Sequence, residues 1–270
     1  MSILTTPPTG SRNLARLVGE WAPALAIGLV AIAIWEFAVR IFDVQRWLLP
    51  APSVIAGEIG ASWALLMRHA AITGQEVVIG FLVAAVAGVA LATAITLSRL
   101  LERSIYPFVI ASQTIPIITI APLLLVWIGP DITSKVIVVA LISFFPIVVN
   151  LVDGLRATDR EMADMLRTLG ASRMQVFMKL KVPMALPYLF SGLKIAAVVA
   201  VIGAVIGEWV GAQGGLGWLM RVSAPQFQTA RVFASIVVLS AMAVSLFLVV
   251  AAVERWALRN YPRATGQGSD

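Results

Sequence analysis

Long apolar runs separated by short polar segments dominate the chain, and their lengths predict membrane-spanning helices. A helix needs about 20 apolar residues to cross roughly 30 Å of hydrocarbon. Three runs without a charged residue reach that length, at 77–98, 104–130 and 232–253. A fourth, 136–152, is shorter, and two more, 22–41 and 186–210, can span if their charged residues lie near the helix ends. The pattern therefore predicts an all-α membrane protein with about six transmembrane helices.

The composition agrees with this prediction and excludes several classes of function. Hydrophobic residues make up 60% of the 270 residues and charged residues 13%, against about half and about a quarter in a soluble domain. Too few polar side chains remain to cover a globule in water. Because the chain has no cysteine and a single histidine, His69, it cannot form a cysteine nucleophile or a cysteine or histidine metal cluster.

Lysine and arginine residues are concentrated on one side of the predicted helices. If the N-terminus is inside, thirteen of the twenty lie in inner segments and six in outer segments, with Lys194 near the inner end of its span. Cytoplasmic loops carry this excess in membrane proteins, so the net charge of +6 gives no reason to expect a nucleic-acid partner. We expect both termini to be cytoplasmic, with an N-terminal segment at 1–21, one transmembrane domain at 22–260 and a tail at 261–270.

Two short helices joined at a glycine are predicted between the fourth and fifth spans. Thr158 with Glu161, and Ser172 with Gln175, have the spacing of capping boxes, in which side chains satisfy the free amides of a helix start. Gly170 lies between the two helices, where a residue with left-handed backbone would cap the end of the first helix. We therefore expect a positive φ there. Apolar residues recur at helical spacing along both helices: Met162, Met165, Leu166, Leu169, Met174, Phe177 and Met178.

This predicted elbow has an apolar face and a basic face, and Pro183 is expected to end its second helix. The segment is too polar to enter the bilayer and too apolar to be a free linker. Two interpretations stay open from the residues alone. The elbow lies on the membrane surface or packs under the protein's own helices, or it docks a soluble partner.

The tail of the elbow resembles the signature loop of permease subunits of binding-protein-dependent ABC importers. In that family Glu-Ala-Ala is followed by three residues, a glycine, nine residues and Ile-x-Leu-Pro. Here Gly170 is followed by nine residues and then Leu180-Lys181-Val182-Pro183, while Asp164-Met165-Leu166 stands in place of Glu-Ala-Ala. The acidic residue is retained, and the two small positions are bulky. The resemblance implies an ATPase-coupling loop at 153–184, with these site residues: Asp164, Leu169, Gly170, Ala171, Ser172, Leu180, Val182 and Pro183.

Other stretches are similar to particular branches of this family. The third span resembles that of the nitrate, sulfonate and taurine branch in three places: 113–116 (QTIP), 121–123 (APL) and 127–129 (WIG). Within that branch, three more stretches look closest to permeases for thiamine-precursor pyrimidines: 144–150, 191–194 and 207–211.

The resemblance implies the fold and assembly of a type I ABC importer permease in the bacterial inner membrane. Two such subunits, as a homodimer or pseudo-dimer, would bind two cytoplasmic ABC ATPase subunits and an extracytoplasmic solute-binding protein. The helix around Gly170 would couple ATP-driven closure to the spans. The chain has no Gly-x-x-x-x-Gly-Lys-Ser/Thr motif, so ATP is expected on the partner ATPase subunit and no cofactor in this chain. The expected solute is a pyrimidine thiamine precursor, or a sulfonate- or nitrate-type solute.

Three residues are candidates for the substrate pathway or its gate: Gln113, Pro116 and Glu208. Prolines at 107, 116 and 122 remove backbone hydrogen bonds from the third span. Neighbouring protein or water must then satisfy the freed carbonyl groups. The third span is therefore expected to be an inner helix, with either a simple packing kink or a role in a moving pathway. Glu208 either lines the path near the outer end of the fifth span or is a capped carboxylate at an interface.

Three further polar features are expected to be structural. Lys194 can extend its charge toward the inner membrane surface. His69 is expected on the surface, beside an outer amphipathic stretch at 53–68. The glycine-rich segment 211–217 is expected to form a flexible outer turn.

A self-contained secondary transporter is the alternative function. Such transporters need acidic residues or broken helices within the membrane to bind coupling ions. Four of the six predicted spans contain no charged residue, which counts against this class. A membrane enzyme is less favoured still, because no paired carboxylates or histidine ligands lie near one membrane face.

Overall fold

The computed structural model describes residues 11–259, and every regular element within them is helical. In chain order the elements are α1 (Ser11–Ile41), α2 (Pro52–Ala61), α3 (Trp63–Leu97), α4 (Arg99–Ser104), α5 (Tyr106–Ser112), α6 (Ile117–Ile128), α7 (Ile132–Arg156), α8 (Arg160–Thr168), α9 (Arg173–Val176), the π-helix η1 (Phe177–Lys181), α10 (Val182–Gly211), α11 (Leu216–Ser223), the 3₁₀-helix η2 (Ala224–Gln226) and α12 (Thr229–Ala257). The predicted tail 261–270 and the first part of the predicted segment 1–21 lie outside the described residues, whereas Ser11 onward belongs to α1.

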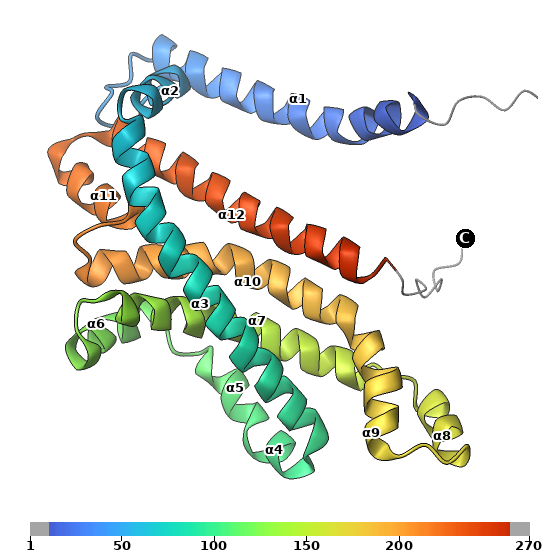
Figure 1. The fold of residues 1–270 in the computed structure, drawn as a ribbon. Helices are drawn as coiled ribbons and strands as arrows, with labels where there is room; N and C mark the ends of the chain where they lie inside the picture. The colour runs from blue at the N-terminus through green and yellow to red at the C-terminus, as the bar shows by residue number, and fades with distance from the viewer. Residues whose placement is uncertain (1–10, 260–270) are drawn as a thin grey trace, which may run out of the picture.

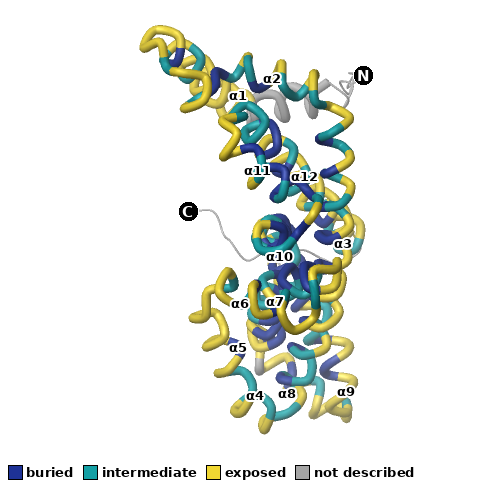
Figure 2. Tube along the Cα trace, turned by 90° about the vertical axis from the view of Figure 1, so that its left-hand side faces the viewer, coloured by how far each residue is buried: buried dark blue, intermediate teal, exposed yellow. Residues whose placement is uncertain are grey.

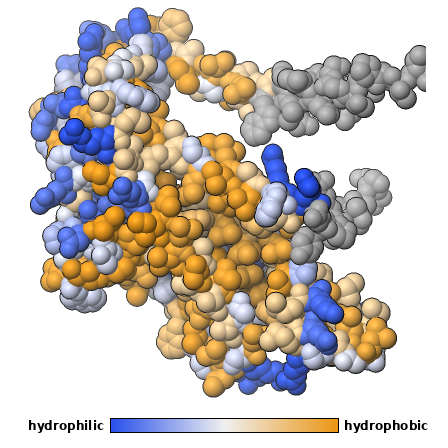
Figure 3. Space-filling view, viewed as in Figure 1, coloured by the Kyte–Doolittle hydropathy of each residue, from blue (hydrophilic) through white to orange (hydrophobic). Residues whose placement is uncertain are grey.

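Six membrane spans are compatible with the lengths and hydropathy of these helices. Five long apolar helices qualify singly: Ala22–Ile41, Trp63–Leu97, Ile132–Arg156, Arg173–Gly211 and Thr229–Ala257. The bent pair Arg99–Ser112 and Ile117–Ile128 makes a sixth when its two helices are counted as one span. Figure 3 shows apolar side chains over the middle of one face, with hydrophilic side chains gathered toward its two ends. The expected all-α membrane fold is confirmed.

The helices α3, α7 and α10 form the packed centre of the molecule (Figure 2). Small residues let helices approach closely in a membrane, where apolar burial alone does not drive association. An added Cβ at Gly192 of α10 would lie 2.7 Å from the Pro146 carbonyl oxygen of α7. One at Gly88 of α3 would lie 3.0 Å from the Ile147 side chain. Close packing between spans therefore requires glycine at these two positions.

In contrast, α1 lies apart from the other long helices and meets the rest at one end (Figure 1). There the Glu36 carboxylate pairs with Arg40 and accepts hydrogen bonds from the Ser53 amide at 2.9 Å and the Ser53 hydroxyl at 2.7 Å. Most side chains from 22 to 41 are exposed. This apolar surface is suited to lipid or to another membrane protein.

The third predicted span is broken rather than straight. Its two parts meet at 98°, with the break at residues 113–116. Pro116 has extended backbone, with φ −62° and ψ 121°, and precedes the first residue of α6, because proline cannot continue a hydrogen-bonded helix. Ala121 and Leu124 of α6 then pack on α7 and α10. Its opposite face is exposed, so this chain's own helices do not enclose the third span as expected.

The glycine contacts at the centre predict the effect of one substitution. Gly192→Val should push α10 away from the Pro146 carbonyl and destabilise the protein by about 1–3 kcal/mol, the usual cost of overpacking a tight core. Gly28→Val is the matched control, since an added Cβ there has no atom within 4 Å. Thermal unfolding of the purified variants in detergent measures both effects. Equal midpoints for the two variants would contradict the packing described here.

Candidate functional site: the elbow and a buried polar cluster

The first helix of the elbow, α8, begins at an aspartate. The Asp159 carboxylate accepts a hydrogen bond from the Glu161 amide at 2.8 Å. Thr158 instead donates its hydroxyl to the Leu155 carbonyl at the end of α7, at 3.4 Å. The predicted Thr158–Glu161 capping box is therefore wrong by one residue. Asp159 takes the capping position because an aspartate oxygen caps an amide as well as a threonine hydroxyl does.

Gly170 turns the chain between α8 and α9 with φ of +86°, so the expected positive φ is confirmed. The amides of Gly170 and Ala171 donate to the carbonyls of Arg167 at 2.9 Å and Leu166 at 3.0 Å. These two bonds make a Schellman motif, which satisfies the last carbonyls of α8. An added Cβ at Gly170 would have no atom within 4 Å, so the backbone conformation, not the space, selects glycine.

The second helix of the elbow starts with the predicted capping box. The Gln175 amide donates to the Ser172 hydroxyl at 3.2 Å, and the Ser172 amide donates to the Gln175 side chain at 2.7 Å. Asp164 of α8 pairs with Arg167 at 2.8 Å and stays exposed. The turn between the helices is therefore held on both sides by bonds within the elbow itself.

Pro183 does not end this second helix, contrary to the sequence prediction. The chain runs from α9 through the π-helix η1 into α10, so Arg173–Gly211 is one continuous helix of 39 residues. In η1 the Val182 amide bonds to the Phe177 carbonyl, five residues back. Pro183 occupies the first turn of α10, where a missing N–H is tolerated. The wider π turn thus lets the helix pass through a proline.

The elbow has a buried side and an exposed apolar side. Ala163, Val176 and Leu180 form a small core of their own, with Leu166 and Ala171 packed against it. Phe177 is buried as well, and five other apolar side chains are exposed and form what we term the elbow apolar face: Met162, Met165, Leu169, Met174 and Met178. Leu169 is 76% exposed. Among residues 11–259 nothing covers this helical surface.

At the other end of α10, Glu208 is buried. It holds what we term the α11 hairpin, the turn and helix at 212–223 that follow α10. Its Oε1 accepts a hydrogen bond from the Thr73 hydroxyl at 2.6 Å, and its Oε2 accepts from the amides of Gly217 at 2.5 Å and Trp218 at 3.4 Å. The two amides belong to the first turn of α11, where the helix dipole favours a negative group. Gly215 precedes this turn with φ of +101° and lies against the carboxylate.

His69 lies beneath the same hairpin and is only 7% exposed. Its Nδ1 accepts a hydrogen bond from the Gly215 amide at 3.1 Å, and its ring stacks on Trp218 with centroids 5.2 Å apart. The expectation of a surface histidine is wrong, because α3 starts at Trp63 rather than at 77. The segment 211–217 is correspondingly held by buried hydrogen bonds, and its expected role as a flexible outer turn is corrected as well.

A buried ion pair lies beside Glu208. Lys135 of α7 approaches Glu76 of α3 to 3.3 Å, with 11% and 1% of the two side chains exposed. The backbone and side chain of Lys135 lie against Gly207, the neighbour of Glu208, and Thr73 lies one turn from Glu76 on α3. Within residues 11–259 neither oxygen of Glu76 has a hydrogen-bond partner. Glu208, His69, Thr73, Glu76 and Lys135 together form what we term the polar cluster. It joins α3, α7, α10 and α11.

The polar cluster overturns the statement that the second and fourth spans carry no charge. Both helices extend beyond the uncharged runs that defined them, so Glu76 and Lys135 lie inside α3 and α7. The spacing His69, Thr73, Glu76 places all three on one face of a helix. That spacing is the signal that could have revealed the cluster, had the second span been extended toward its N-terminus.

Other predicted residues lie away from this cluster. Gln113 and Pro116 are exposed at the break of the third span, and within the described chain neither shares a hydrogen bond with Glu208. Lys194 pairs with Glu254 of α12 at 2.7 Å, instead of only extending toward the membrane surface. The structure therefore brings the elbow residues together but not the three pathway candidates.

Residues 78–259 match the family described as binding-protein-dependent transport system inner membrane component. The chain belongs to this family. It is a permease, the membrane-spanning subunit of an ABC importer, and the resemblance carried by Gly170 and the Leu-x-Val-Pro tail is confirmed. The family match sets the secondary-transporter alternative aside, whereas the argument against it from uncharged spans did not hold.

The chain aligns with several curated relatives over most of their length. The formylaminopyrimidine transport permease protein ThiX of Halalkalibacterium halodurans is 40% identical over 84% of this chain and 90% of its own. The riboflavin transport system permease protein RibX of Chloroflexus aurantiacus is 34% identical over 92% and 93%. The putative aliphatic sulfonates transport permease protein SsuC of Bacillus subtilis is 30% identical over 86% and 86%. These relatives confirm the branch that the sequence stretches indicated.

Solved structures confirm the type I importer fold. A chain of the inward-facing MetNI methionine ABC transporter aligns with a TM-score of 0.64 and 19% identity over 73% of this permease and 97% of that chain. A chain of an amino acid ABC transporter with histidines aligns with a TM-score of 0.59 and 16% identity over 75% and 96%.

The buried ion pair of the permease predicts a double-mutant result. Lys135→Met leaves Glu76 buried without its partner and should destabilise the protein by about 3–5 kcal/mol. Adding Glu76→Gln removes the second charge and should recover most of that loss. Thermal unfolding of the purified single and double variants gives the comparison, with Arg40→Met, which removes an exposed partner of Glu36, as a control of little effect. A double variant no more stable than Lys135→Met would contradict a direct interaction.

Proposed function

We propose that this permease imports a small nitrogen heterocycle of the pyrimidine type, delivered by an extracytoplasmic solute-binding protein. It acts as a homodimer, and two cytoplasmic ATPase subunits hydrolyse the ATP that drives transport. The elbow lies in the cytoplasm with both termini and docks on the ATPase. Asp164, Ser172 and the residues around Gly170 form the coupling loop.

The elbow apolar face is the observation that carries the coupling role. Met165 is 55% exposed and Met174 58% exposed, on a segment whose turn is held by its own hydrogen bonds. Methionine side chains adapt to the shape of a partner surface, and an amphipathic helix commonly binds by laying its apolar face into a groove. An elbow packed under its own helices would instead have buried these side chains, so the exposure counts against that interpretation and agrees with docking on a partner.

The continuous helix from α9 to α10 gives the docked elbow a route into the membrane. Phe177 and Leu180 of η1 are buried, so the π-helix is packed on the rest of the chain. A displacement of α9 by the ATPase is therefore passed to α10 without a hinge loop between them. Glu208 near the far end of α10 holds α11, and this arrangement supports a role for the hairpin as the outer gate.

The charge distribution supports the orientation. Arginines at the ends of α7 and α8 and the basic residues of η1 all lie at the elbow end. An excess of lysine and arginine marks cytoplasmic loops. The elbow end therefore faces the cytoplasm, and the α11 hairpin faces the binding protein.

The names of the relatives support the substrate class. The two permeases named for a formylaminopyrimidine and for riboflavin, both nitrogen heterocycles, are 40% and 34% identical, and the sulfonate relative is 30% identical.

We place Gln113 and Pro116 on the transport path, because a helix break at membrane depth is tolerated where it lines a cavity or is covered by protein. In a homodimer the exposed break can meet both conditions.

Gly170→Val tests the coupling role. A β-branched residue at φ +86° should strain the turn by about 1–3 kcal/mol and misalign the elbow. Insertion into the membrane should be unchanged, since the spans are untouched. We expect co-purification of the ATPase, normalised to permease in the membrane, to fall together with transport. Gly170→Asn is the matched control, because asparagine tolerates a positive φ and should keep most of both.

An unchanged ATPase ratio with full transport in Gly170→Val would remove the coupling role. Loss of the permease itself, with normal recruitment by the remaining protein, would assign the elbow a purely structural role instead.

A further inference from the structure

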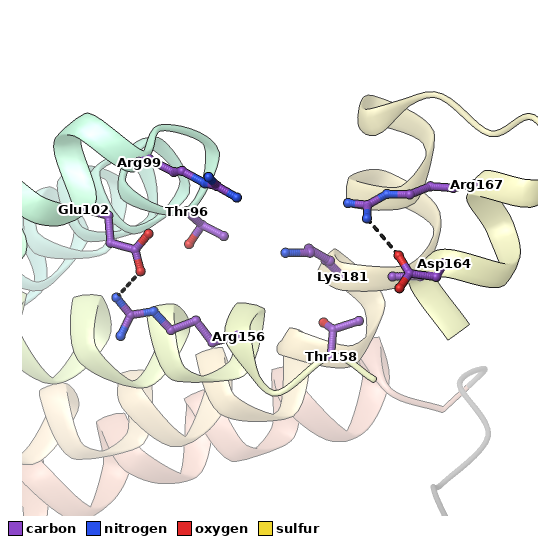
Figure 4. Close-up of a pocket in the computed structure, with 9 residues that line it drawn as sticks. Thr96, Arg99, Glu102, Arg156, Thr158, Asp164, Arg167 and Lys181 are labelled. Atoms are coloured by element: carbon purple, nitrogen blue, oxygen red, sulfur yellow. Dashed lines mark hydrogen bonds and ion pairs between the residues drawn. The ribbon is translucent and has the colours of Figure 1, made fainter. Parts of the chain in front are cut away.

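A polar cavity separates the elbow from the ends of the spans beside it. It has a volume of about 600 Å³. Figure 4 shows side chains from α4, α7, α8 and η1 around one space. Six of the lining residues are charged: Arg99, Glu102, Arg156, Asp164, Arg167 and Lys181. Of these six, only Asp164 is among the residues that we named for the coupling loop.

The charges of this cavity do not balance. Its four cations and two carboxylates sum to +2. Glu102 is already paired with Arg156 at 2.7 Å, and Asp164 with Arg167 at 2.8 Å. In the part of the chain that the structure describes, Arg99 and Lys181 have no carboxylate within 4.0 Å, and Figure 4 shows them pointing toward one another across the gap. Two like charges are thus held at opposite walls without a counter-ion from the described protein.

The position of the cavity fits the headgroup level of a membrane. Arg99 lies two residues after Leu97, the last residue of the α3 span, and Arg156 is the last residue of the α7 span. An adjoining cavity shares Arg99 and Lys181 and adds Leu97 and Phe177, so apolar side chains flank the charged space. Basic pockets of this kind at the ends of membrane helices bind anionic headgroups. The guanidinium group of arginine is also shaped to bind two phosphate oxygens at once.

We propose that this cavity binds a phosphate group, with Arg99 and Lys181 as its two anchors. The oxygens of one phosphate bind both side chains, so the group bridges α4 to η1 and neutralises the charges that face each other. The bound group thereby ties the elbow to the ends of the spans. The phosphate of an anionic phospholipid and a soluble phosphate share this chemistry. The proposal needs neither the ATPase nor the transported solute, and it can fail while the coupling role stands.

The test uses the purified full-length permease without the ATPase. Native mass spectrometry measures retention of phosphatidylglycerol relative to phosphatidylcholine, and thermal unfolding compares inorganic phosphate with chloride at equal ionic strength. The variant is Arg99→Gln with Lys181→Gln. The matched control is Arg103→Gln with Lys179→Gln, which removes the same charges from α4 and η1 at exposed positions that line neither cavity.

We expect the wild type and the control to prefer phosphatidylglycerol and the variant to lose at least about tenfold in affinity, from two charge-assisted hydrogen bonds. Stabilisation by inorganic phosphate without a lipid preference would assign the site to a soluble phosphate. Without any phosphate the variant should unfold at the same temperature as the wild type or higher, because a repulsion is removed, and this excludes misfolding as the cause. Equal lipid retention by variant and control, with no effect of phosphate on the wild type, would overturn the proposal.

Discussion

One continuous helix, Arg173–Gly211, joins the elbow of this permease to its buried polar cluster. At 1.5 Å per residue its 39 residues correspond to at most about 58 Å of helix axis. The elbow lies at its first end, and Glu208 with the α11 hairpin lies near its last. Between them, Gly192 and its small neighbours pack α10 tightly on α7. Because packed cores have discrete arrangements and do not deform continuously, a displacement at one end is expected to move the whole helix.

The buried charged residues of the spans are arranged around that helix. Glu208 lies on α10, and Glu76 and Lys135 lie on the two helices that pack against it. A charge in hydrocarbon is costly, and such residues are retained in membranes where they pair or bind backbone amides. Here the hydrogen bonds of Glu208 also hold the hairpin, so the same interactions that make its burial tolerable fix the Gly211 end of the helix. At the Arg173 end the charges are unbalanced, and the elbow is separated from the spans by a polar cavity.

Local sequence determined some of these features and could not determine others. The spans, the positive φ of Gly170 and the Ser172 cap were predictable because each depends on residues within one turn or one run. Pro183 looked like a helix end, since no local rule predicts the π-helix that carries the chain past it. His69, Glu76 and Lys135 looked like residues outside the spans, because their burial depends on contacts between α3, α7 and α11. The break at Pro116 was predicted as a kink, but its 98° angle depends on packing against α7 and α10.

We expect the elbow and α10 to move as one rigid unit. The chain has no cysteine, so spin labels can be placed in pairs at Arg173 with Ile195, and at Arg173 with Arg103, all on accessible residues. Pulsed electron–electron distance measurements on the permease with its ATPase, with and without nucleotide, then give the two distances. The distance from Arg173 to Ile195 should stay unchanged, and the distance from Arg173 to Arg103 should change. A nucleotide-dependent change between Arg173 and Ile195 would show a hinge at the π-helix and rule out a rigid unit.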